Sequence, residues 1–122
     1  MTLDQIWEFL ENQLEGLSPA IIKRKSNENM IEYAGTKEVM QGKQKVAGHY
    51  FASIVKKPKD VRLYFFPIYT HLKEYGPLSQ DLKKMLKGKS CFHVKQLNPK
   101  LEEEIMDIIS KGKELYLKDQ LI

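Results

Sequence analysis

Residues 49–66 read HYFASIVKKPKDVRLYFF, and this stretch decides the fold. Its two ends, residues 49–55 and 61–66, are rich in the β-branched and aromatic residues that favour strands, and the central KKPKD is typical of a turn. We therefore expect a β-hairpin. The second strand, VRLYFF, is apolar on both faces, which predicts a central strand in a sheet that helices cover on at least one side.

Weaker strand patterns lie on both sides of the hairpin. They are NMIEYA at 29–34, a short candidate strand at 38–41, and SCFHVK at 90–95. In the last of these, alternation places Phe92 and Val94 toward the core, with Cys91 and His93 on the other face. Because the strands cluster in the middle of the chain and their links are short, antiparallel pairing is favoured.

Three helices complete the expected fold. The first runs from a Thr2 cap, with a capping-box pattern, to Gly16. A short helix begins at Pro77-Leu78 and ends at Gly88, and the last helix begins at Asn98-Pro99. Gly112 lies on the apolar stripe of this last helix, which predicts a close approach to the sheet.

The link between the first helix and the first strand is ambiguous. Ser18-Pro19 resembles a second helix start, and residues 20–22 are compatible with a helical turn or with a strand. We therefore predict a single α+β domain over residues 1–122. It has an antiparallel sheet of about five strands packed against N-terminal and C-terminal helices, with an extra short helix before the last strand.

Composition narrows the class of protein. The chain has 122 residues and one cysteine, Cys91, so an internal disulfide is excluded. No apolar stretch approaches the ~20 residues of a membrane span, and the acidic N-terminus does not resemble a secretory signal. We expect a cytoplasmic monomer that does not contact membranes. The net charge of +4 is uneven, because residues 21–100 carry 17 bases and six acids while both ends are acidic.

The acids of the first helix form one ridge. Spacings of 4, 3 and 4 place them within about 60° of one another beside the apolar stripe. Such a ridge is a solvated face, or its like charges are relieved by a basic partner or by a bound cation, for which hard cations and iron are suited. The ridge consists of Asp4, Glu8, Glu11 and Glu15.

The sequence contains no recognisable catalytic arrangement. Its three histidines, His49, His71 and His93, have no metal-ligand spacing. Cys91 and His93 share a strand face, but their Cα atoms should lie about 7 Å apart, too far for a tight nucleophile–base hydrogen bond. Gly88-Lys89-Ser90 lacks the earlier glycine and the following helix of a phosphate loop. We therefore expect no catalytic residues and a protein that is not an enzyme.

Several segments resemble the YdhG-like family of bacterial domains. They are the strand pair YFASIV…VRLYFFPIY, the segment DLKKMLKGKSCFHVK and the closing LNPKLEEEI, which together span roughly residues 30–117. The resemblance implies a frataxin-like α+β fold and iron binding or delivery, with iron-cluster assembly proteins as partners. The first-helix ridge is of the same general kind as the acidic surface that such proteins present to iron.

Two other functions are compatible with the chain. One is a small-ligand or anion-binding pocket between the sheet and residues 69–76, suggested by polar and aromatic positions in this half of the family. The other is nucleic-acid binding by the basic centre, although we expect most of its aromatic rings in the core and do not expect nucleic acid as a partner. The candidate pocket residues are Tyr64, Tyr69, His71, Lys89 and His93.

Overall fold

A computed structural model describes residues 1–122 and confirms the α+β class. Its centre is a six-stranded antiparallel sheet in the order β1-β2-β5-β6-β8-β7. The strands are β1 (Ile21–Asn27), β2 (Met30–Gly35), β5 (Tyr50–Lys56), β6 (Val61–Phe65), β7 (Leu86–Lys87) and β8 (Cys91–Val94). As predicted, β5 and β6 form a hairpin and β6 is a central strand.

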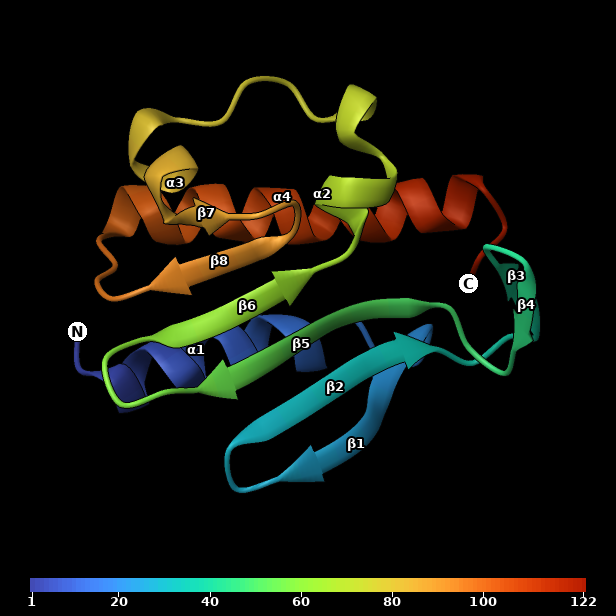
Figure 1. Ribbon diagram of the computed structural model, residues 1–122, viewed down its shortest axis with the longest axis horizontal. Helices are drawn as coiled ribbons and strands as arrows, with labels where there is room; N and C mark the ends of the chain where they lie inside the picture. Colours follow the sequence, from blue (N-terminus) through green and yellow to red (C-terminus); the bar gives the residue numbers. More distant parts are fainter.

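Two long helices, α1 (Leu3–Glu15) and α4 (Pro99–Lys118), pack on the same face of the sheet. Figure 1 views the sheet from the face opposite these helices, so both helices lie behind the strands. On the helix face, Phe51 and Phe65 are fully buried and stack edge-on, and Tyr116 of α4 stacks on Phe51. We call the opposite face of the six-stranded sheet, which no helix covers, the open face.

The smaller elements lie at the margins of the sheet. The hairpin of β3 (Val39–Gln41) and β4 (Gln44–Val46) forms a separate two-stranded sheet between β2 and β5 in the sequence. The link from β6 to β8 contains α2 (Pro67–Thr70), the 3-10 turn η1 (Leu72–Glu74) and α3 (Gln80–Met85).

Of the two alternatives left open for residues 20–22, the structure shows the strand. The chain turns at Ser18-Pro19 and enters β1, which pairs with β2 from Ile21↔Gly35 to Asn27↔Met30. Ile21 is buried, whereas the other six residues of β1 are exposed. Such a polar strand is tolerated because β1 is an edge strand, where lysine and arginine discourage pairing with another chain.

Three further elements differ from the predictions. The strand expected at 38–41 is β3, which lies outside the main sheet. The helix expected from Pro77 to Gly88 is shorter, because Ser79 caps it at its start and Leu86–Lys87 pairs with β8 as β7. Residues 67–70, which we assigned to no element, form α2 with proline in its first turn.

Other local predictions are confirmed. Thr2 and Gln5 form the capping box of α1, and the Asn98 side chain caps α4. At Gly112, an added Cβ would lie 2.7 Å from the Phe65 ring and 3.0 Å from both Pro67 and the Tyr75 hydroxyl. The close approach of α4 to the sheet therefore depends on a glycine at this position.

Candidate functional site

Three of the four ridge acids on α1 form ion pairs with lysines of the sheet. Lys23 Nζ on β1 lies 3.2 Å from Glu15 and 3.9 Å from Glu11, and Lys56 on β5 pairs with Asp4. The Tyr33 hydroxyl also donates to Glu15 at 3.0 Å. The like charges of the ridge are thus partly relieved by basic partners, one of the possibilities that the sequence left open.

Glu8 is the ridge acid without an ion pair. It is exposed on α1, and the Asp4 side chain is 80% exposed despite its contact with Lys56. Nowhere in the chain do three His, Cys, Asp or Glu side chains converge in a group able to hold a metal ion. The ridge therefore offers single carboxylates to a cation, not a preformed cage.

The structure places the five candidate pocket residues in three different surroundings. Tyr64 and His93 lie on the open face, while Tyr69 and Lys89 meet at its margin, with Lys89 Nζ 5.3 Å from the centre of the Tyr69 ring. His71 is nearly buried beside α4, where it contacts the carboxylate of Asp119 at 2.6 Å. None of the five main surface hollows is lined by any of the five residues.

The open face itself carries the polar residues of the central strands. Leu63 of β6, paired with Ile54 and Phe92, is buried against the helices. Side chains alternate along a strand, so the neighbouring pairs point the other way. These pairs form two cross-strand rows: Met30–Val55–Arg62–His93 and Glu32–Ser53–Tyr64–Cys91.

A nearly buried carboxylate anchors the first row. Asp60, whose side chain is only 7% exposed, accepts a hydrogen bond from Arg62 Nε at 3.2 Å. Its second oxygen lies 3.6 Å from His93 Nδ1. Asp60 therefore holds the Arg62 guanidinium through a hydrogen bond, and its second oxygen lies close to the His93 ring.

The second row contains the cysteine. Burial raises the pKa of the Cys91 thiol, although a hydrogen bond with Tyr64 and the charge of Arg62 act in the opposite direction. The thiol is therefore protonated at neutral pH, whereas the nucleophilic form of cysteine is the thiolate.

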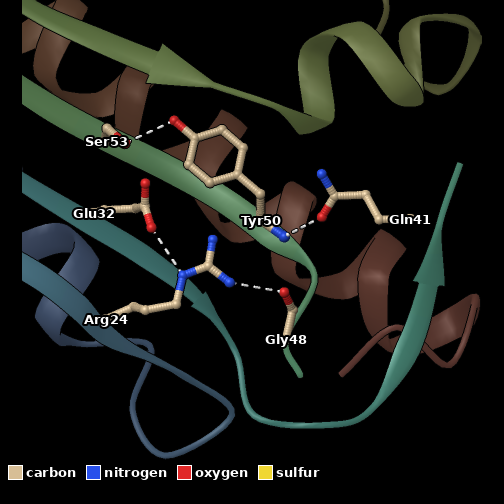
Figure 2. A network of polar contacts seen from close by, with 6 residues as sticks. All are labelled: Arg24, Glu32, Gln41, Gly48, Tyr50 and Ser53. Atoms are coloured by element: carbon tan, nitrogen blue, oxygen red, sulfur yellow. Dashed lines mark hydrogen bonds and ion pairs between the residues drawn. The ribbon is translucent and has the colours of Figure 1, made fainter. Parts of the chain in front are cut away.

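A polar network orders the open face near the β3–β4 hairpin, as Figure 2 shows. Arg24 of β1 donates to the Glu32 carboxylate at 2.8 Å and to the Gly48 carbonyl at 3.0 Å. The Tyr50 amide donates to the side chain of Gln41 in β3, and the Tyr50 hydroxyl lies 2.7 Å from Ser53 Oγ. Burial raises the pKa of Tyr50 to about 12, so its hydroxyl stays neutral.

Lysines without acidic partners border this face. A shallow hollow of about 300 Å³ is lined by the β5–β6 turn and Arg62, and Lys57 and Lys59 extend from that turn. It adjoins a hollow of about 610 Å³ between this turn and the β1–β2 turn, which Lys57 also lines. Neither Lys57 nor Lys59 forms an ion pair.

Aromatic rings border the other end of the open face. The ring of Phe66 lies 5.4 Å from that of Tyr50 and 5.8 Å from that of Tyr69. Tyr69 is 47% exposed, and Tyr50, Tyr64 and Phe66 are partly exposed. Sequence reasoning assigned most such rings to the core. The alternation of VRLYFF contained the correcting signal, because only one set of its side chains can face helices that lie on one side.

Comparisons with known proteins add no functional information: no family model, no curated protein and no solved structure matches the chain. No helix of the chain has the length and apolar character needed to cross a membrane.

Proposed function

We propose that this chain is a non-enzymatic binding protein that takes anionic ligands on the open face of its sheet. One observation carries the proposal. Both carboxylates on this face, Glu32 and Asp60, are paired with arginines, while Lys57 and Lys59 at its border have no acidic partner. The face therefore has an excess of positive charge, which attracts anions and orients their approach.

The carboxylate of Asp60 contributes to anion binding by positioning the guanidinium of Arg62. An anion that reaches Arg62 meets a guanidinium that Asp60 holds in place through Nε, so its remaining N–H groups are fixed in direction. His93 beside it supplies a further ring nitrogen. This arrangement supports a defined contact site with a flexible basic border formed by Lys57 and Lys59.

Binding is favoured over catalysis by the state of the one candidate nucleophile. The Cys91 thiol is protonated, because burial raises its pKa above the ordinary value. His93 lies 3.6 Å from Asp60, and it has no hydrogen bond to Cys91.

The proposal is tested by titrating the protein with inorganic tripolyphosphate at low salt while recording NMR spectra. We expect selective shifts at Arg62, His93 and residues 57–60, with little change along α1. The double variant Lys57→Gln/Lys59→Gln should weaken this binding. The matched control Lys100→Gln/Lys118→Gln removes the same charge from exposed positions on α4 and should leave binding unchanged. Equal losses in both variants would mean that the net charge alone attracts the anion.

A further inference from the structure

We propose that the anion taken by the open face is a single-stranded nucleic acid, whose bases stack on Tyr69 and Tyr64 while its phosphates meet the surrounding lysines and Arg62. This inference rests on the proposed function and adds the class of ligand. What points to it is the combination of free cations with accessible aromatic rings on one face of the molecule.

The rings form a supported platform. Phe66 lies between Tyr50 and Tyr69, at ring separations of 5.4 and 5.8 Å, and His49 packs against Phe66 at 5.9 Å. Tyr50, Phe66 and Tyr69 are thus held by neighbouring rings, which limits the entropy lost when a base stacks on Tyr69. Tyr69 is the most accessible of them, with 47% of its surface exposed. Every base has a flat π-face, so such a platform binds single strands with little sequence preference.

Further cations lie beside these rings. Lys89 Nζ lies 5.3 Å from the centre of the Tyr69 ring, and Lys87 of β7 is paired with Cys91, beside Tyr64. On β6, Arg62 precedes Tyr64 by two residues, which places the two side chains about 7 Å apart on the same face. A single strand lying along β6 would pass from the lysines at the Lys57 end of the face, past Arg62, to the rings of Tyr64 and Tyr69.

The same geometry argues against other polyanions. In a duplex the faces of the bases are stacked on one another, so a double helix could use the lysines but not the rings. An acidic peptide would likewise use only the charges. The exposed rings would then have no role in binding, whereas a single strand uses both sets of side chains.

The test compares a fluorescent oligouridylate with an abasic strand of equal length, which has the same phosphates but no bases. Fluorescence anisotropy at low salt should show the oligouridylate binding at least about tenfold more tightly. Tyr69→Leu should weaken oligouridylate binding about tenfold and leave abasic binding unchanged, since an exposed leucine preserves charge and approximate size. Tyr69→Phe, which keeps the ring, should bind as the wild type does. Leu72→Ala, at a neighbouring exposed position without a ring, is the matched control.

The possible outcomes distinguish nucleic-acid binding from general anion binding. Equal affinity for the two strands, or equal competition by a duplex or by polyglutamate, would overturn the nucleic-acid assignment while anion binding stands. An unchanged affinity of Tyr69→Leu would also overturn it. Failure of every one of these polyanions to bind at low salt would remove both proposals.

Discussion

Replacing Gly112 by alanine should destabilise the protein, although alanine is the better helix former. The added Cβ would lie 2.7 Å from the Phe65 ring and 3.0 Å from Pro67 and the Tyr75 hydroxyl. These neighbours have little freedom to move, because Phe65 is fully buried and Tyr75 donates a 2.7 Å hydrogen bond to the Ile108 carbonyl. Relief therefore requires α4 to move away from the sheet.

The magnitude follows from two opposing contributions. An extra methyl group in a packed core costs about 1–3 kcal/mol, and replacing glycine by alanine inside a helix gains about 1 kcal/mol. The expected net loss at Gly112 is therefore about 1 kcal/mol, with a fall in Tm of about 4 °C for a domain of this size. At the exposed position Ser110 the same helix has no such contacts, so Ser110→Ala should be neutral or slightly stabilising.

Urea denaturation followed by circular dichroism measures both variants. We expect the midpoint of Gly112→Ala to lie below that of the wild type with an unchanged slope, and that of Ser110→Ala to lie at or above it. A Gly112→Ala midpoint equal to or higher than that of the wild type would refute the packing argument, because the helix would then have room for the methyl group.

Three further outcomes can be measured. Burial lowers the pKa of His49, so the folded protein favours the neutral imidazole. The free energy of unfolding should therefore fall as the pH drops below about 6.5, the pKa of histidine in the unfolded chain. Urea titrations between about pH 7.5 and about pH 5 should show a weaker pH dependence for His49→Gln than for the wild type. If the α1 ridge binds iron, ferrous iron should selectively shift the NMR signals of residues 4–15. The shifts should be larger in Lys23→Ala, because this variant frees the carboxylates of Glu11 and Glu15. Unchanged spectra at millimolar iron would contradict iron binding at the ridge. For single-stranded nucleic acid, Lys57→Gln/Lys59→Gln should reduce the slope of log K against log salt by about 1.4, whereas an unchanged slope would show that neither lysine meets a phosphate.

The fold was predictable where the pattern of apolar residues in the sequence matches the burial of side chains in the structure. VRLYFF alternates buried and partly exposed side chains on a central strand, and the caps of α1 and α4 lie where their sequences indicate. The strand β1 was not predictable in the same way. Six of its seven residues are exposed, and its register shifts between Lys23 and Lys25, so it shows no alternating apolar pattern.

Missing β1 also affected the interpretation of the ridge. From the sequence, the acids of α1 had no basic partner nearby in the chain, yet Lys23 reaches two of them from β1. The open face was hidden for a related reason. The environment of Arg62 depends on the pairing of β6 with β8, which brings His93 beside it, and on Asp60 at the preceding turn. Spacing within a single strand does not contain that information.

The order of strands also bears on how the chain folds. From β1 to β6 each strand of the main sheet pairs with the next one along the chain, and the β3–β4 hairpin is itself a local pair. Sheets of this kind grow through short loop closures, which favour rapid folding. The β5–β6 turn, closed by a hydrogen bond from the Lys57 amide to the Asp60 carbonyl, is the natural starting point. Substitutions in this turn should slow folding, whereas substitutions between α1 and α4, whose contact joins the two ends of the chain, should mainly accelerate unfolding.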